Sequence, residues 1–486
     1  MASGFALLSR EGSWSAAEVS AASDTVAAAL SAEGVPRGAV VAHQCRLDPG
    51  GAVALGAIAK AGGVLAPLHA AWTEYERDTF LATVRPVAAL TGRGIEWPAS
   101  GWSSRSLEVP AFGELTLHRR EPTSPGPPAA GLGARLGAGI EAGAVLATSG
   151  SDGVPRLVAH EWRSLDANAA AANERLGFGP GDRWLATLPW AHVGGLAVPL
   201  RAAAAGAAVG LASPRFDAEA VVRALGDLAI THVSLVPAML HGLLDVGARP
   251  PGSLRAVLLG GAATPPDLVD RALSAGWPVA LTYGLTEAGS QVATATPREV
   301  RAGERSSGRP LPGVQVRICP VAEAKGDEAP GGESAGGEIE VRGPTLFHGY
   351  AGEPPRQRGA WFATGDLGRL DAHGRLEVTG RLRDRIVSGG ANIDPVEVEA
   401  VLTAHPEVRE AAVIGLPDQT WGQIVTAVIV GGDPQLASRV DRWCRERLSG
   451  ARAPRRWEMV DCLPRTATGK VDRARLRSRM AGLRCD

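Results

Sequence analysis

The segment AVLATSGSDGVPRLV, residues 144–158, joins a short apolar run to a loop rich in hydroxyl groups and glycine. The apolar run predicts a β-strand, so the loop follows the carboxyl end of a strand, where open α/β sheets bind their ligands. Arg156 adds a permanent positive charge, whereas Asp152 puts a carboxylate where phosphate would be repelled. The groups that can donate hydrogen bonds to phosphate oxygens are Thr148, Ser149, Gly150, Ser151 and Gly153. These residues alone leave two interpretations open, a phosphate loop and an ordinary surface turn.

Strand and helix patterns alternate on both sides of this segment. Alanine-rich runs with helical spacing, such as 17–30 and 51–61, alternate with β-prone runs, among them WLATL (184–188), THVSLV (231–236), RAVLL (255–259) and PVALT (278–282). This alternation predicts an α/β fold whose large N-terminal domain has mostly parallel sheets flanked by helices. The stretches 119–143 and 321–337 are rich in glycine and proline and predict surface connections.

The pattern restarts near residue 383. A short strand, a helix beginning at Pro395 and two further strands at 408–415 and 424–430 predict a smaller α+β domain. We therefore expect residues 1–383 to form the N-terminal domain and residues 384–486 to form a mobile C-terminal domain.

Charge and cysteine usage restrict the classes of partner. The chain has 50 basic and 51 acidic side chains, and a formal net charge of −1 gives no general attraction to nucleic acid or to an anionic membrane. The basic tail, residues 439–486, has 14 basic and 6 acidic side chains and is either a solvated face or a surface for a phosphorylated ligand. The 5 scattered cysteines, the absence of a secretory signal and the charges within the apolar runs predict a cytoplasmic protein without a membrane span, either a monomer or a homodimer.

Further polar groups stand where strands end or turns begin. YGLTEAGSQ (283–291) follows the run PVALT directly and offers an aromatic ring, a hydroxyl and a carboxylate, Glu287, that can hold Mg²⁺. Asp366 lies in a tight glycine turn suited to ribose hydroxyls, and Arg381 follows downstream. Lys470 is the one lysine in the arginine-rich tail. Taken singly, Asp366 is equally a turn cap, and the two cations are equally solvated charges.

Together and in this order, the motifs resemble those of the adenylate-forming superfamily of acyl-CoA and aryl-CoA synthetases, luciferases and peptide-synthetase adenylation domains. The resemblance extends from the N-terminal helices to Lys470. It implies that a carboxylic acid attacks the α-phosphate of MgATP to give an acyl adenylate and pyrophosphate, after which a thiol, usually that of coenzyme A, displaces AMP. It also implies a hinge near Asp384, about which the C-terminal domain rotates between the two half-reactions.

The same resemblance assigns roles to single residues. The loop from Thr148 to Arg156 holds the leaving phosphates, and Glu287 holds Mg²⁺. The catalytic residues that the resemblance implies are Lys470, Thr286, Glu287 and His192, with His192 lining the acyl pocket. The residues around adenine and ribose are Gly260, Gly261, Tyr283, Gly284, Asp366 and Arg381. The segment 388–393 resembles the loop that admits coenzyme A, and the basic tail, including Arg455 and Arg456, becomes a surface for its phosphates.

Two positions depart from the pattern of the family loop. Threonine is usual where Asp152 stands, and lysine is usual where Arg156 stands. Guanidinium also binds phosphate, so the arginine is compatible with the role. Asp152 either points outward, pairs with an arginine or weakens the binding of pyrophosphate. We expect activity to survive because the backbone donors of the loop remain.

Three stretches point to the acid: LPWAHVGGLAVPLR (188–201), VSLVPAML (233–240) and LLGGAATPPDL (258–268) followed by YGLTEAGSQ. They resemble the o-succinylbenzoate-CoA ligases of menaquinone biosynthesis more than fatty acyl-CoA synthetases. That acid has two carboxylates, so the one that is not activated needs a polar or cationic partner. Arg201 is the candidate, and its alternative is a helix residue whose head reaches solvent. The supporting hydrogen-bonding residues are Ser234, Ser290 and Gln291.

Three other functions remain open. The chain is also compatible with another aryl-CoA or acyl-CoA synthetase and with a carrier-protein-dependent adenylation domain. A nucleotide-binding protein without catalysis is suggested only by Asp152. The presence of Glu287, Asp366, Arg381 and Lys470 argues against that last alternative.

Overall fold

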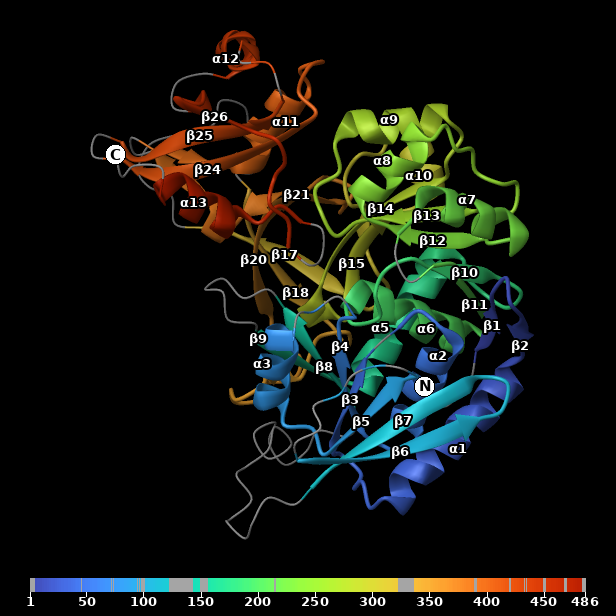
Figure 1. Ribbon diagram of the computed structural model, residues 1–486. Coiled ribbons are helices and arrows are strands. Elements are labelled where there is room, and N and C mark those ends of the chain that lie inside the picture. The colour runs from blue at the N-terminus through green and yellow to red at the C-terminus, as the bar shows by residue number, and fades with distance from the viewer. Residues whose placement is uncertain are drawn as a thin grey trace.

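The computed structural model describes residues 5–482 with gaps at 45, 71, 73, 94, 96, 98–100, 122–142, 149–155, 214–215, 322–335, 389–390, 419–420, 432, 434, 449–451 and 467–469. Within the described residues, the strands form four sheets, three in the N-terminal part of the chain and one in the C-terminal part (Figure 1). No helix among these residues has the length and apolar character that a membrane crossing requires.

The first sheet has a parallel centre and antiparallel edges. Its order is β16 (Arg309–Pro310), β15 (Ser290–Ala295), β14 (Val279–Leu285), β13 (Ala256–Leu259), β12 (His232–Leu235), β10 (Arg183–Ala186), β11 (Ala208–Leu211), β1 (Ala6–Leu8) and β2 (Ser13–Trp14). The pairs from β14 to β1 are all parallel. Strands β10, β12, β13 and β14 are the runs predicted at 184–188, 231–236, 255–259 and 278–282, so these four predictions are confirmed.

The second sheet contains the opening segment of the sequence. Its order is β19 (Gly349–Tyr350), β9 (Arg156–Glu161), β8 (Gly143–Thr148), β4 (Val64–Leu68), β3 (Val40–Gln44), β5 (Ala88–Gly92), β7 (Gly113–Arg120) and β6 (Trp102–Val109). The predicted strand at 144–148 is β8, which pairs antiparallel with β9 across the loop 149–155. The strand that follows the loop is thus placed between β8 and β19.

Helices lie between and outside these two sheets. Helix α5 contacts β8 and β9 of the second sheet and β15 of the first, so it links the two sheets. The helices of the N-terminal part are α1 (Ala16–Ala32), α2 (Pro49–Lys60), α3 (Glu74–Val84), α5 (Trp162–Leu176), α6 (Val193–Ala205), α7 (Ala218–Asp227), α8 (Pro237–Asp245), α9 (Pro266–Ser274) and α10 (Pro297–Arg301). Helix α1 begins at a capping box in which Ser15 and Glu18 satisfy each other's backbone N–H groups.

The third sheet was not part of the sequence prediction. Strands β17 (Gln315–Cys319), β18 (Gly337–Arg342), β20 (Phe362–Leu370) and β21 (Leu376–Arg381) are all antiparallel. Charged residues alternate with apolar ones along β17 and β18, and Arg317 Nε donates to Glu340 Oε2 at 2.7 Å across the pair. The stretch 321–337 separates these two strands in the sequence, and because residues 322–335 lie outside the described residues, its interpretation as a surface connection stays a prediction.

The C-terminal part is the predicted α+β unit. Its strands are β22 (Ile386–Ser388), β23 (Ala391–Ile393), β24 (Glu410–Asp418), β25 (Gly422–Val430) and β26 (Arg456–Val460), and its helices are α11 (Pro395–Thr403), α12 (Leu436–Arg447) and α13 (Arg473–Gly482). Val398, Leu402, Val413, Val425 and Ile429 belong to a core separate from that of the large sheets. Figure 1 shows this part beside β20 and β21, which connect it to the rest of the chain.

Candidate active site

The motif residues gather at one edge of the first sheet. Ser234 lies in β12, Gly260 and Gly261 directly follow β13, and Tyr283 lies in β14. Because parallel strands end at a common edge, these positions converge although they are distant in sequence. A side chain at Gly260 would place its Cβ 2.6 Å from Thr282 Cγ2, so only glycine allows the loop to pass so close to β14.

Three of the predicted nucleotide contacts touch one another. Tyr283 Oη donates to Asp366 Oδ2 at 2.7 Å, and Arg381 Nε lies 2.7 Å from Asp366 Oδ1. The pair is aligned by register, since Asp366 of β20 faces Arg381 of β21. Asp366 is only 3% exposed. Burial, together with the Asp366 charge, raises the pKa of Tyr283 well above its ordinary value, so its hydroxyl keeps its proton. We call these three residues the nucleotide corner.

Thr286 and Glu287 are held by residues that the sequence did not single out. They lie in a short 3₁₀ turn, η1 (Thr286–Ala288). His160 Nε2 donates to the Thr286 carbonyl at 2.7 Å, and burial lowers the pKa of His160 to about 4. Tyr350 Oη donates to Glu287 Oε1 at 2.9 Å. No pattern in the sequence marked His160 or Tyr350, because both act across the boundary between the two large sheets.

Gly284 allows the two strands that flank this turn to approach each other closely. It lies at a bulge in β14, where a Cβ would come 2.1 Å from the Ser290 carbonyl oxygen. Ser290 itself has a φ of 132°, which is uncommon for a residue with a side chain. The close approach of the two strands therefore depends on glycine at position 284.

Thr148 and Arg156 frame the predicted phosphate loop. Thr148 Oγ1 donates to the Arg156 carbonyl at 3.2 Å, which closes the β8–β9 pair. Arg156 Nη2 lies 3.0 Å from Glu353 Oε1, and its guanidinium lies 3.5 Å from the centroid of the Tyr350 ring. Ser149, Gly150, Ser151, Asp152 and Gly153 lie outside the described residues, so the interpretation of this loop and of Asp152 stays a prediction.

Arg201 is a buried cation that has no acidic partner in the part of the chain that the structure describes. Its side chain, on α6, is 0% exposed, so its head does not reach solvent. Nη2 donates to Ser290 Oγ at 3.2 Å, and the guanidinium lies 4.8 Å from the centroid of the Trp184 ring. Nε and Nη1 have no hydrogen-bond partner among the described residues. Burial lowers the pKa of Arg201 to about 9, so the group remains charged at neutral pH.

The other predicted pocket residues divide into two groups. Ser234 Oγ accepts a hydrogen bond from Trp184 Nε1 at 3.0 Å, so Ser234 supports the ring beneath Arg201. Gln291 Nε2 instead donates to Thr294 Oγ1 at 2.6 Å and to Thr282 Oγ1 at 3.3 Å. Arg201 thus contacts Ser290 directly and Ser234 through Trp184, whereas the amide nitrogen of Gln291 is bonded to two threonines and its Oε1 has no hydrogen-bond partner among the described residues. We call this cluster of four buried side chains, Arg201, Ser290, Ser234 and Trp184, the arginine pocket, a name for the cluster and not for a measured cavity.

His192 faces a second histidine that the sequence did not single out. His192 precedes α6, and its ring centroid lies 5.0 Å from that of His69. Burial lowers the pKa of His192 to about 4, with smaller contributions from His69 and Lys470. Lys470, from the C-terminal part, therefore lies close enough to His192 for its charge to act on that ring.

Asp384 and the basic tail are paired within the C-terminal part. Asp384 Oδ1 lies 3.2 Å from Arg477 Nη2 of α13. Arg456 Nε donates to Glu458 Oε1 at 2.9 Å, whereas the Arg455 guanidinium lies 3.9 Å from the Trp421 ring centroid. The segment 388–393 spans β22 and β23, with residues 389–390 outside the described part.

The side chains present fit a magnesium ion whose ligands come mainly from the nucleotide and from water. Mg²⁺ in nucleotide sites is usually bound through one or two carboxylates, phosphate oxygens and water. Glu287 supplies one such carboxylate, and within the described ranges no group of three or more His, Cys, Asp or Glu side chains could form a cage made of protein alone. The predicted role of Glu287 as the residue that would hold the metal is therefore compatible with the side chains described.

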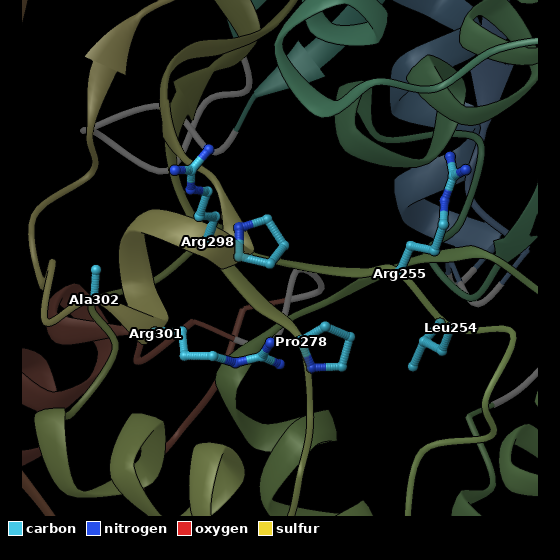
Figure 2. A pocket seen from close by; sticks show the side chains of 7 residues that line it. Leu254, Arg255, Pro278, Arg298, Arg301 and Ala302 are labelled. Carbon is cyan, nitrogen blue, oxygen red and sulfur yellow. The ribbon is translucent and has the colours of Figure 1, made fainter.

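A separate cavity of about 530 Å³ opens at the opposite edge of the first sheet (Figure 2). Leu254 and Arg255 precede β13, and Pro278 precedes β14, so this cavity lies at the amino ends of the strands. None of the predicted site residues lines it.

Two family models match the chain. The model of the AMP-binding enzymes matches residues 4–351, and that of the AMP-binding enzyme C-terminal domain matches residues 397–470. The 2-succinylbenzoate–CoA ligase of Bacillus licheniformis is 39% identical over 340 residues, which cover 69% of this chain and 70% of that protein. The enzyme of the same name from Geobacillus kaustophilus is 37% identical over 349 residues, which cover 69% of each chain.

Solved structures agree with this relationship. The o-succinylbenzoate CoA synthetase (MenE) from Bacillus subtilis in complex with the acyl-adenylate intermediate OSB-AMP has a TM-score of 0.79 and 29% identity, covering 98% of this chain and 95% of that one. The same synthetase with ATP and magnesium ion has a TM-score of 0.78 and 28% identity, with 99% and 97% covered. ATP-bound MatB from Rhodopseudomonas palustris has a TM-score of 0.79 and 27% identity, with 99% and 96% covered, so overall shape does not distinguish between these two relatives. The matches of the family model and of the curated relatives establish that the chain belongs to the AMP-binding enzyme family.

Proposed function

We propose that this protein is an AMP-forming acid–thiol ligase that converts o-succinylbenzoate to its coenzyme A thioester in menaquinone biosynthesis. A carboxylate of the acid attacks the α-phosphate of MgATP, which releases pyrophosphate and leaves an acyl adenylate. The thiol of coenzyme A then attacks the acyl carbon and releases AMP. The family and the curated relatives support this reaction, since the enzymes of Bacillus licheniformis and Geobacillus kaustophilus are named 2-succinylbenzoate–CoA ligases.

The first step brings two anions together and therefore needs fixed positive charge. In the proposal, Lys470 and Arg156 supply it with Mg²⁺ on Glu287, which neutralises phosphate charge when bound. The nucleotide corner holds the ribose and lines the adenine slot with Gly260 and Gly261. Residues 1–383 bind ATP and the acid, and residues 384–486 form the domain that rotates about Asp384 to admit coenzyme A.

The arginine pocket is the observation that carries the choice of acid. A buried guanidinium with unused donors costs several kcal/mol relative to one that is paired. A second carboxylate on the substrate would accept from Nε and Nη1 of Arg201 and offset this cost. A monocarboxylic acid would leave the cation unpaired, so the pocket favours an acid with two carboxylates.

His192 has a different role in this proposal. Its pKa of about 4 keeps the imidazole neutral at neutral pH. A neutral ring beside the reacting carboxylate orients the acid without adding a second cation next to Lys470. We therefore assign positioning, and not proton transfer, to His192.

The proposal needs no macromolecular partner. The enzyme acts on an acid, ATP and coenzyme A, without nucleic acid, as a monomer or a homodimer. Cys319, Cys444 and Cys462 are all unpaired, which is compatible with a reducing compartment, and we place the reaction in the cytoplasm.

The test is detection of the thioester. The protein is incubated with MgATP and coenzyme A together with o-succinylbenzoate, benzoate or a medium-chain fatty acid, and the products are identified by mass spectrometry. We expect a coenzyme A thioester from o-succinylbenzoate. A product from another acid alone would retain the enzyme class and reject the acid.

A further inference from the structure

A chain of contacts connects the end of the predicted phosphate loop to Glu287. Arg156 begins β9, Tyr350 ends β19, and the two strands pair antiparallel, with Tyr350 facing Val158. This pairing brings the guanidinium of Arg156 to 3.5 Å from the centroid of the Tyr350 ring. The hydroxyl of the same ring donates to Glu287 Oε1 at 2.9 Å.

Among the described residues, the further hydrogen bond that holds Glu287 is made by its backbone. Its carbonyl oxygen accepts from the Phe347 N–H at 2.8 Å. Oε2 forms no hydrogen bond with the described residues, whereas Oε1 is engaged by Tyr350. One carboxylate oxygen is therefore oriented by the protein and the other is left for a ligand.

At the other end of the contact chain, Arg156 forms an ion pair with Glu353, which would compete with a phosphate for the guanidinium. Arg156 Nη2 lies 3.0 Å from Glu353 Oε1, and both side chains are about half exposed. An ion pair this exposed is weak and easily exchanged for a phosphate oxygen. The ring of Tyr350 remains beneath the guanidinium whichever anion is bound, since a cation over an aromatic face is held without using its N–H donors.

We propose that Tyr350 is a positioning residue for MgATP, which orients Glu287 for the metal through its hydroxyl and supports Arg156 through its ring, while Glu353 competes with ATP for Arg156. The inference rests on the proposed function, because it assumes that MgATP binds at this edge. It adds two residues, Tyr350 and Glu353, to those that the motifs identify. It also separates their roles, since the Tyr350 hydroxyl acts through the metal ligand Glu287, whereas Glu353 acts on Arg156 without the metal.

The experiment measures ATP affinity by calorimetry, once with Mg²⁺ and once with EDTA, in the absence of acid and coenzyme A. Tyr350→Phe removes the hydroxyl and keeps the ring. We expect its affinity for metal-free ATP to equal that of the wild type, and its gain in affinity on adding Mg²⁺ to fall by about tenfold, as for loss of a hydrogen bond to a charged group.

Glu353→Gln is expected to act in the opposite way. Removing the competing carboxylate should strengthen metal-free ATP binding by a few-fold, at most about fivefold, and leave the gain on adding Mg²⁺ unchanged. Glu219→Gln is the matched control, since Glu219 also forms an exposed ion pair, with Arg223 at 3.3 Å, but on the remote helix α7. It should change neither affinity.

The outcomes separate this inference from the function on which it rests. A wild type that binds neither form of ATP would overturn both. If the wild type binds MgATP and Tyr350→Phe, with an unchanged Tm, shows the full gain on adding Mg²⁺, the role of Tyr350 is refuted while the proposed function stands. Unchanged metal-free affinity in Glu353→Gln would refute the competition for Arg156.

Discussion

The nucleotide corner and the arginine pocket are both buried polar clusters, but they differ in how their hydrogen bonds are satisfied. In the corner, both carboxylate oxygens of Asp366 are engaged, one by Tyr283 and one by Arg381. In the pocket, two nitrogens of Arg201 have no partner among the described residues. The hydrogen bonds of the corner are therefore satisfied within the protein, whereas the pocket keeps donors that an anion could use. If the proposed roles hold, the nucleotide-binding side chains are already arranged by the protein, and the choice of acid depends on the charge of Arg201.

The largest effect is expected from removing that charge. Arg201→Met should lower kcat/KM for o-succinylbenzoate by about a hundredfold, equivalent to roughly 3 kcal/mol, because the second carboxylate loses a buried charged partner. Steady-state kinetics with o-succinylbenzoate and benzoate measures it, with Arg201→Lys as the control that keeps a charge without the planar fork. An equal loss with both acids would show that Arg201 does not recognise the second carboxylate.

A smaller effect is expected in the nucleotide corner, where a substitution should lower the stability of the protein. Asp366→Asn leaves Arg381 and Tyr283 without their anionic acceptor, so the free energy of unfolding should fall by about 1–3 kcal/mol and ATP should bind about tenfold more weakly. Urea denaturation and calorimetry measure the two quantities. If the variant is as stable as the wild type, the corner is not the preformed element that the comparison requires.

The dependence of stability on pH tests two histidines, His160 and His192, that lie outside these two clusters. Burial lowers the pKa of His160, beside Thr286, and of His192, beside His69, to about 4 in each case. Unfolded histidine titrates near 6.5, so between about pH 6.5 and 4 the unfolded chain binds more protons than the folded one. Stability should therefore decline as the pH falls through this window and level off below it. Denaturation midpoints between pH 4 and 8 measure the decline, which His160→Asn and His192→Asn should each reduce; equal slopes in wild type and variants would contradict it.

The smallest effect is expected outside both regions, on the basic tail. Arg456 is paired with Glu458, so Arg455, which lies on Trp421, is the better probe of coenzyme A binding. Arg455→Glu should raise the KM for coenzyme A a few-fold and leave ATP–pyrophosphate exchange unchanged. Arg223→Glu, on the distant helix α7, is the matched surface control. An unchanged KM would remove the tail from the coenzyme A site.

Sequence patterns predicted the nucleotide corner better than the residues that support it. Tyr283, Asp366 and Arg381 stand in motifs that resemble those of the family, but the contact between Tyr283 of β14 in the first sheet and Asp366 of β20 in the third was not predicted. His160 and Tyr350 carry no comparable signal, since their partners Thr286 and Glu287 are 126 and 63 residues away and belong to other elements. Only the packing of the two large sheets reveals these contacts.

For the residues predicted to bind the acid, the sequence likewise did not reveal which contacts the side chains make. The sequence proposed Arg201 as a partner for a carboxylate but left a solvated head equally open, because helical spacing does not reveal which face is covered. Burial against Trp184 and Ser290 decides that question. The pairing of His192 with His69 could not be predicted, since two single histidines 123 positions apart form no pattern.

We propose that Arg201, which has no acidic partner among the described residues, binds the second carboxylate of the acid. The most direct measurement is the Tm of the wild type and of Arg201→Met, each with and without o-succinylbenzoate, in the presence of an ATP analogue that cannot react. The account predicts that the variant alone melts at or above the wild type, and that the acid raises the Tm of the wild type only. A variant that melts well below the wild type without acid, and gains as much from the acid as the wild type does, would show that Arg201 has a structural role and would contradict the account.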